Sequence, residues 1–390
     1  MAIPAAPYED VFEEDTAEDE RVSGMGAMLL DRRRLTFGML LVLALIAAIY
    51  VLFPRVVGLN GELARISGAA WYWVAIAVAF DVAAFGAYVA LFRGVLGGTA
   101  SAGVRERLDA GASYQITMAG LAATRIFSAA GAGGIVLTYW ALRKAGMPRR
   151  RSACRMVAFL VLMYSVYGFA LILFGVLLRT GVLPGDAPVA GTIVPAGLAG
   201  GAMLIAGLIA LIPGDLERRL SNLSGKGRIA RAAAKLGPVA ATAATGIRTA
   251  IDYVRHPRRG ALAVGGAVGF WAANIGVLWA SFEAFGGSVP FGVLVQGFFV
   301  GMAANLIPSP AGGVGSVDAG MIGAFILFGI PAGIVFPAVL TYRVIAFWLP
   351  IPPGIVAFFH LRRTVARWER ERQGYTSQSK VTAEAGSGSV

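Results

Sequence analysis

The chain has 390 residues, of which 57% are hydrophobic and only 14% are charged, and its formal net charge is +12. A soluble chain normally carries about a quarter charged residues, so this composition excludes an ordinary soluble domain and indicates a protein surrounded by lipid. One cysteine and two histidines exclude an intrachain disulfide and make a Cys/His metal site implausible. We therefore expect no metal and no cofactor. We also expect no nucleic-acid partner, because the excess positive charge of a membrane protein gathers on its cytoplasmic loops.

The N-terminal segment, residues 1–34, is strongly polar and changes sign along its length. Its first 20 residues hold eight acids and no Lys or Arg, and it ends on Arg32, Arg33 and Arg34. A cleaved signal peptide has the opposite order, with positive charge first and an apolar stretch directly after it. We predict an acidic, disordered cytoplasmic tail with a basic flank.

A transmembrane domain is predicted over residues 35–361. Crossing the hydrocarbon takes roughly 20 apolar residues in a helix. Six stretches qualify: 35–53, 69–91, 153–178, 192–212, 261–285 and 332–359. Two further apolar regions, 111–142 and 291–330, are interrupted by Gly and Pro. The predicted fold is an all-α polytopic membrane protein with about six full spans and two broken or re-entrant helical hairpins. Residues 362–390 are predicted to form a second disordered cytoplasmic tail.

The distribution of Lys and Arg predicts the orientation. Residues 213–260 hold ten Lys and Arg against three acids, whereas residues 54–68, 179–191 and 286–290 together hold three basic residues. The positive-inside rule then places both termini in the cytoplasm, in a pattern that suits an inner or plasma membrane. Within the basic loop, residues 226–256 have helical apolar spacing. They form either a helix attracted to anionic lipid or an ordinary basic loop.

The two interrupted regions resemble each other. Residues 122–134 read AATRIFSAAGAGG and residues 303–315 read AANLIPSPAGGVG. Each motif is followed by an Arg-x-x-Ala-Phe sequence in the next span, beginning at Arg155 and Arg343, so the repeat covers residues 122–159 and 303–347. With the predicted topology the halves are inverted, which is the arrangement of alternating-access transporters. Chance matches in Ala- and Gly-rich sequence are the alternative.

The second motif carries a resemblance to a known family. The run from Pro310 to Gly315, followed by Asp318, together with Tyr342-Arg343 and Leu349-Pro350, resembles the lysylphosphatidylglycerol synthase transmembrane family, also called flippase-like membrane proteins. The resemblance covers roughly residues 35–361. Two departures are Asp318, where the family usually has glutamate, and Ala311, which interrupts the Pro-Gly-Gly run. The soluble aminoacyl-transferase domain of the full synthases is absent from the chain. The resemblance implies movement of a lipid or a lipid-linked head group between leaflets.

Candidate substrate-binding residues cluster at the two breaks. Half-helix ends offer free N–H groups to an anion, and a guanidinium can bind phosphate through two hydrogen bonds. The candidates are Arg125, Ser128, Gly131, Gly134, Ser309, Gly312, Gly313, Gly315, Asp318 and Arg343. For Arg125 and Arg343 the alternative is a structural ion pair with Asp318 or Asp81. Asp318 could instead cap the helix that follows it.

Asp81 lies in the middle of the second predicted span, where an ionised carboxylate is costly and a functional role is the default expectation. We consider an ion- or proton-coupling site and a buried ion pair with Arg125 or Arg343 equally consistent with the sequence.

Three functions remain open at this stage. The favoured one is translocation of an anionic or phosphate-bearing membrane lipid, as a flippase or scramblase. The alternatives are an ion-coupled transporter of a small polar solute and a non-transporting membrane interaction protein. No catalytic motif is present, which argues against an enzyme. The sequence leaves open the identity of the lipid, the energy source and whether the chain forms a homo-oligomer.

Overall fold

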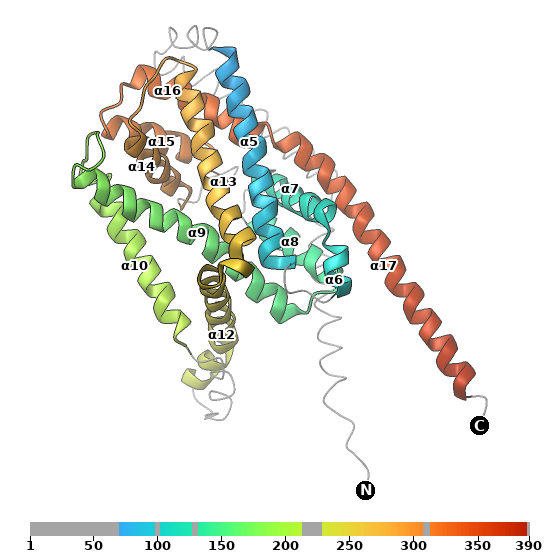
Figure 1. Cartoon of the computed structure of the whole chain (residues 1–390). Helices are drawn as coiled ribbons and strands as arrows, with labels where there is room; N and C mark the ends of the chain where they lie inside the picture. Colours follow the sequence, from blue (N-terminus) through green and yellow to red (C-terminus); the bar gives the residue numbers. More distant parts are fainter. Residues whose placement is uncertain (1–69, 98–101, 127–131, 213–227, 307–312, 388–390) are drawn as a thin grey trace.

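A computed structural model of the chain describes residues 70–97, 102–126, 132–212, 228–306 and 313–387 (Figure 1). Within these ranges all regular secondary structure is helical, which confirms the predicted all-α class. The acidic tail and the first predicted span, residues 35–53, lie outside the described residues.

Five helical segments of the described chain are long and apolar enough to cross a membrane. Each corresponds to one of the predicted spans, and the protein is therefore a multi-pass membrane protein. The five are α5 (Trp71–Phe92) with its π-helical continuation η2 (Arg93–Gly97), α9 (Arg149–Arg179), α10 (Ile193–Ala210), α13 (Pro257–Glu283) and the run Ala332–Glu371.

The last of these runs is interrupted. It consists of α16 (Ala332–Arg343), the π-helical turn η4 (Val344–Trp348) and α17 (Ile351–Ser387). Pro350, Pro352 and Pro353 follow η4 closely. Proline has no N–H to donate to the carbonyl four residues earlier, so a regular α-helix cannot continue through this sequence without unpaired carbonyls. The break at η4 becomes part of the candidate site.

Helices α5 and α13 form a closely packed pair, drawn side by side in Figure 1. A Cβ added at Gly266 would lie 2.4 Å from the backbone nitrogen of Leu91, and one at Gly94 would lie 2.7 Å from the backbone nitrogen of Ala263. Small residues let membrane helices approach until their backbones touch. This pair provides a rigid wall beside the candidate site.

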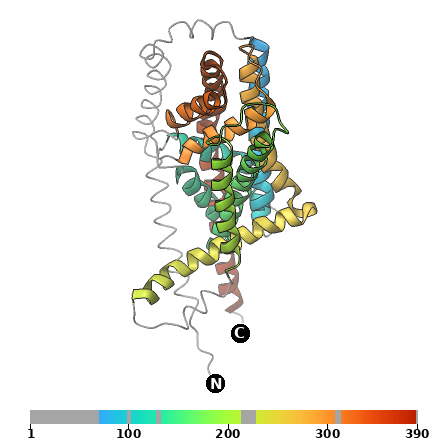
Figure 2. The ribbon, with the colours of Figure 1, turned by 90° about the vertical axis from the view of Figure 1, so that its left-hand side faces the viewer.

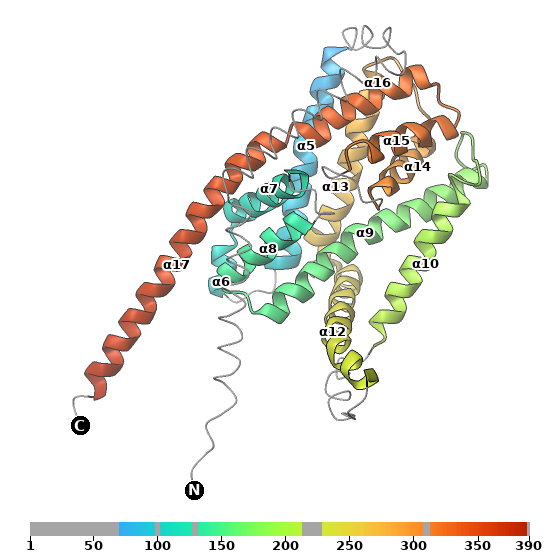
Figure 3. The same cartoon turned by 180° about the vertical axis from the view of Figure 1, so that it is seen from behind.

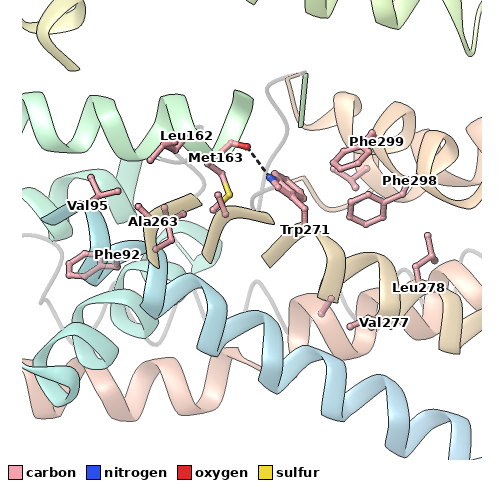
Figure 4. Packing of buried hydrophobic residues seen from close by; sticks show 14 of the residues in the cluster. Phe92, Val95, Leu162, Met163, Ala263, Trp271, Val277, Leu278, Phe298 and Phe299 are labelled. Atoms are coloured by element: carbon pink, nitrogen blue, oxygen red, sulfur yellow. Dashed lines mark hydrogen bonds between the residues drawn. The ribbon is translucent and has the colours of Figure 1, made fainter. Parts of the chain in front are cut away.

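The core between α13 and α9 is aromatic. The indole N–H of Trp271 donates to the carbonyl of Met163 at 2.9 Å, and the Trp271 ring meets Phe298 and Phe299 of α14 (Phe291–Met302) edge to face (Figure 4). Because the indole nitrogen is paired, the ring can be buried without an orphaned donor. These contacts fix the second interrupted region against the bundle.

Both interrupted regions form helical hairpins. In the first, α7 (Ala110–Ile126) packs on α8 (Ala132–Lys144); in the second, α14 continues through the 3-10 turn η3 (Ala303–Leu306) and packs on α15 (Ser316–Leu327). The helices α8, α14 and α15 have only 13, 12 and 12 residues. These are shorter than the roughly 20 residues that a full crossing needs. Figures 1 and 3 place the two hairpins at different heights of the bundle.

The basic segment forms a long helix, α12 (Arg228–Arg255), which runs obliquely across one end of the bundle (Figure 2). It packs on α9, α10 and α13. On its described part, Ala241, Ala244, Ala250 and Tyr253 are buried. Of the two alternatives for this segment, the structure shows the helix, over Arg228–Arg255, and its attraction to anionic lipid remains a prediction.

The disordered tail predicted at residues 362–390 is corrected by the structure, in which α17 continues as a helix to Ser387. Leu361, Val365 and Trp368 are buried, and α17 packs along α7. Thr364 donates to the side-chain oxygen of Gln115 at 2.9 Å. The charged composition concealed an apolar stripe at positions i, i+4 and i+7, which is the pattern of a docked amphipathic helix.

Candidate functional site

The two hairpins and the interrupted last span meet at η4. Arg125, at the end of α7, donates through one terminal nitrogen to the carbonyl of Ala346 at 2.8 Å and through the other to the carbonyl of Phe347. Ala346 is the residue four positions before Pro350, so its carbonyl has no regular helical partner. The guanidinium of the first break thus pairs the Ala346 carbonyl, which Pro350 leaves without a helical donor, and also binds the neighbouring carbonyl of Phe347.

Arg343, at the end of α16, binds the second break. Its Nε lies 2.6 Å from Oδ1 of Asp318, and a terminal nitrogen donates to the carbonyl of Gly313 at 3.2 Å. The Nε–H is not directed at the carboxylate oxygen, so the contact with Asp318 is ionic rather than a hydrogen bond. Arg343 is buried. The ion pair predicted as the alternative for Arg343 and Asp318 is confirmed.

Asp318 has a second structural role at the start of α15. Its Oδ2 accepts a hydrogen bond from the backbone N–H of Gly315 at 2.8 Å. Gly315 adopts φ +85°, a conformation that favours glycine. A carboxylate in the first turn also interacts favourably with the helix dipole. The predicted capping role of Asp318 is confirmed, alongside the ion pair.

A single aromatic ring contacts both arginines. The guanidinium carbon of Arg343 lies 4.4 Å from the centre of the Phe347 ring, and that of Arg125 lies 4.8 Å from it. Both distances are within the range of cation–π attraction. Phe347 also packs on Val314 at the tip of the second hairpin. The two sequence motifs predict an arginine at each break but give no indication of the ring that contacts both.

A cavity of about 510 Å³ lies beside this junction. It reaches both breaks, since Arg125 and Gly134 of the first and Asn305 and Gly313 of the second contribute to its wall. Arg343 is not part of the wall. The remaining lining is mixed: the polar side chains are Tyr88, Thr117, Thr124, Thr138 and Tyr164, and the large apolar ones are Phe92, Leu96, Leu121, Ile135, Met156, Phe159, Leu160, Phe270 and Leu306.

Thr124 joins the two helices of the first hairpin at the cavity wall. Its hydroxyl donates to the carbonyl of Gly120 at 2.9 Å and accepts from the N–H of Gly134 at 3.1 Å. Gly134 lies in the first turn of α8, where the N–H groups have no helical partner. The Gly134 N–H, which the sequence analysis assigned to substrate, is therefore engaged by Thr124.

Asp81 lies on α5 and is buried. Its charge and that of Arg125 act on each other electrostatically, and α5 packs on both α7 and η4. Asp81 is not among the residues that line the cavity. The role of Asp81 as an ion-coupling site remains a prediction, and its interaction with Arg125 agrees with the alternative of a buried ion pair.

Four predicted site residues lie outside the described residues: Ser128, Gly131, Ser309 and Gly312. Three of the others line the cavity: Arg125, Gly134 and Gly313. Asp318 forms the ion pair with Arg343 and accepts the hydrogen bond from Gly315, and these contacts stabilise the second break. Their binding of a substrate remains a prediction.

Three residues of the site, Thr117, Asn305 and Phe347, are not among those predicted from the sequence. Thr117 and Thr124 are seven residues apart on α7, so they lie on one face of that helix, and this spacing could have indicated a polar stripe. Asn305 occupies the position of Thr124 in the repeated motif. No comparable signal marks Phe347.

Comparisons with known proteins support the family suggested by these motifs. Over 86 residues, the chain is 28% identical to a UPF0104 membrane protein of Methanothermobacter thermautotrophicus (strain Delta H), a match that covers 22% of this chain and 26% of that protein. The chain thus matches about a quarter of the length of this relative. No solved structure matches the chain. Residues 38–354, most of the chain, match the family described as the lysylphosphatidylglycerol synthase TM region, and the chain belongs to this family.

Proposed function

We propose that the protein moves a membrane lipid, or a lipid-linked head group, between the two leaflets. The observation that carries this proposal is the cavity of about 510 Å³ at the meeting point of the two breaks. Its wall combines one cation, Arg125, with hydroxyl groups and a large apolar surface. Such a wall suits an amphipathic ligand, whose anionic head group needs charge-assisted hydrogen bonds while its glycerol and acyl portions need apolar contact.

The architecture is consistent with this role. Backbone breaks inside a membrane are tolerated where protein or a watery cavity satisfies the free polar groups. Here the breaks belong to hairpins of short helices. We propose that both hairpins are re-entrant, and that they enter from opposite sides as the basic residues predict. The segments rich in Lys and Arg, such as residues 213–260, would then face the cytoplasm.

Arg125 is the proposed head-group contact. Two of its N–H groups are bound by the carbonyls of η4, and a guanidinium has five. Arg125 lines the cavity, and in this proposal an anionic oxygen accepts from its remaining donors. Arg343 holds the second break in place and acts on the substrate only through the shape of the cavity.

The test is a reconstituted-liposome assay with fluorescent phospholipids, scored by the fraction of label that an external reductant reaches. Wild-type protein is expected to speed up label exchange. Replacing Arg125 with Ala is expected to slow exchange about tenfold or more, because it removes a charge-assisted contact. Arg93→Ala, at an exposed arginine outside the cavity, is the matched control. Wild-type protein that moves no lipid overturns the proposal.

One observation favours a second function. Asp81 is a buried carboxylate within a span, coupled electrostatically to Arg125. Such a pair suits an ion-coupled transporter of a small polar solute. Solute uptake that follows a proton or sodium gradient and is abolished in Asp81→Asn, without lipid movement, would favour this alternative.

A further inference from the structure

We infer that the outer face of α17 is a binding surface for the anionic head groups of the lipid leaflet beside it. This surface, which we call the arginine face, is formed by Arg362, Arg363, Arg367 and Arg370, all of them exposed. None of these residues lines the cavity. The inference therefore does not depend on the proposed function.

The packing of α17 on α7 determines the direction in which the arginines point. The buried stripe of α17 runs from Leu361 to Trp368, and α17 lies along the outside of the bundle and extends past it (Figure 3). In a helix of 3.6 residues per turn, Arg363 and Arg370 lie opposite this stripe, and the other two arginines lie to either side of them. The arginines can turn toward the bundle only if the apolar stripe becomes exposed.

A contact with α8 fixes the depth of the arginine face. Glu369 pairs with Lys144, the last residue of α8, at 2.8 Å. Lys144 begins the basic turn before α9, which also contains Arg149, Arg150 and Arg151. The positive-inside rule predicts this turn at the cytoplasmic surface. The arginine face therefore lies at the level of that surface, directly after the last span.

The arginine face carries a positive charge that carboxylates offset only in part. Residues 361–371 hold four arginines and two acids, Glu369 and Glu371, and Glu369 is already paired with Lys144. Among the described residues, no ion pair joins a carboxylate to an arginine of this face. Clusters of about four to eight basic residues next to a span bind anionic lipid, since the negative potential of a leaflet extends about one Debye length. A guanidinium can also bind a phosphate through two hydrogen bonds.

Lipid bound at the arginine face would also hold the cavity wall in place, because α17 is tied to α7 at two points. A Cβ added at Gly354 would lie 2.8 Å from the Cβ of Ala122. Further along, Thr364 donates to the side-chain oxygen of Gln115 at 2.9 Å. Helix α7 ends with Arg125 at the cavity. Anionic lipid at α17 should therefore stabilise the first hairpin.

The experiment titrates the purified full chain, in a neutral detergent, with phosphatidylglycerol or phosphatidylcholine and counts the bound lipids by native mass spectrometry. Wild-type protein should bind phosphatidylglycerol more tightly than phosphatidylcholine. The triple variant Arg362→Gln, Arg363→Gln, Arg367→Gln should weaken the binding of phosphatidylglycerol about tenfold or more, because each basic residue near an anionic surface contributes about fivefold in affinity. The same three residues changed to Lys should retain the preference for phosphatidylglycerol, since the charge is kept.

Two controls separate this surface from others. The variant Arg93→Gln, Arg150→Gln, Arg258→Gln makes the same change in net charge at exposed arginines outside α17 and outside the cavity, and it should keep most of the binding. Arg125→Ala should remove lipid from the cavity and leave binding at the arginine face intact.

A second measurement is the thermal unfolding midpoint of the full chain in phosphatidylcholine nanodiscs with and without phosphatidylglycerol. The anionic lipid should raise the wild-type midpoint, because a ligand that binds the folded state stabilises it. The triple Gln variant should lose this increase and keep the wild-type midpoint in phosphatidylcholine alone.

Three outcomes would overturn the inference. If the triple Gln variant binds phosphatidylglycerol as wild type does, the arginines serve only to orient the chain in the membrane. If the control triple variant loses as much binding, net charge and not the arginine face attracts the lipid. If the triple Gln variant is destabilised equally with and without phosphatidylglycerol, the face binds another part of the chain, for which the acidic residues 1–20 are the candidate by charge.

Discussion

The two breaks are similar in sequence and different in construction. In the first, Arg125 and Thr124 bind backbone groups and remain at the wall of the cavity. In the second, the buried Arg343 forms an ion pair with the half-buried Asp318, and neither side chain lines the cavity. The first break therefore leaves its arginine at the cavity wall, whereas the second pairs its arginine directly with a carboxylate.

The repeat explains part of this difference. At the constant spacing that relates the two motifs, Leu306 stands where the first motif has Arg125. The counterpart of Arg343 is Arg155, which donates to the carbonyl of Val95 in the π-helical turn η2 and contacts the hydroxyl of Tyr253. The two arginines at the junction thus come from different positions of the repeat. Their convergence on Phe347 arises from the fold rather than from the duplicated sequence.

The largest expected effect is a difference in stability between the two arginines. Arg343→Ala leaves the half-buried Asp318 carboxylate without its cationic partner, although Asp318 keeps its hydrogen bond from Gly315, so we expect a cost of about 3 kcal/mol, the lower end for a buried pair. Arg125→Ala leaves two carbonyls without partners, with a smaller cost of about 1–3 kcal/mol. Thermal unfolding of the purified proteins in detergent should rank wild type above Arg125→Ala, and Arg125→Ala above Arg343→Ala.

The control for this ranking is the double variant Arg343→Ala with Asp318→Asn. Removal of both charges relieves the unpaired carboxylate, and the Asn side-chain oxygen can still accept from the N–H of Gly315. Part of the lost stability should return. If Arg343→Ala is as stable as wild type, the ion pair is not what holds the second break.

Much of the fold was predictable because lipid imposes simple requirements. Length and hydropathy locate α5, α9, α10 and α13 within a few residues, since a spanning helix must be long and apolar. The continuation of α17 beyond residue 361 was missed because its charged face dominates the composition while its buried stripe is narrow. The interruption at η4 was missed although Pro350, Pro352 and Pro353 mark it in the sequence.

The candidate site was predictable only in part. Arg125, Arg343 and Asp318 were identifiable, since charges in apolar sequence are costly and require a reason. Which arginine meets the cavity depends on how the hairpins pack against η4, and this information is tertiary.

A smaller effect tests the packing inside each hairpin. A Cβ at Gly134 would lie 2.6 Å from the carbonyl oxygen of Gly120, and one at Gly320 would lie 2.5 Å from the Cβ of Ala304. Both contacts are too close, so Gly134→Ala and Gly320→Ala should each lower stability by about 1–3 kcal/mol. Gly134→Ala should also slow lipid exchange, since Gly134 lines the cavity and Gly320 does not.

The matched control for these glycines is Gly323→Ala, on the same helix as Gly320. An added Cβ there meets nothing within 4 Å. Its unfolding midpoint should equal or exceed that of wild type, because Ala favours a helix over Gly. Equal losses in all three variants would show that the effect comes from glycine in general and not from the hairpin contacts.

The smallest expected effect concerns the ring shared by the two breaks. Phe347→Leu keeps an apolar side chain but removes the π face that lies within 5 Å of both guanidinium carbons. Each exposed cation–π contact contributes about 0.5–1 kcal/mol and a desolvated one more, so double-mutant cycles with Arg125→Lys and with Arg343→Lys should each give a coupling of that order. Coupling to both arginines would mean that Phe347 links the first break to the second. A change at either break would then alter the stability of the other. Coupling to Arg343 alone would make the ring part of the second break, and Arg125 would then act on η4 only through its carbonyls.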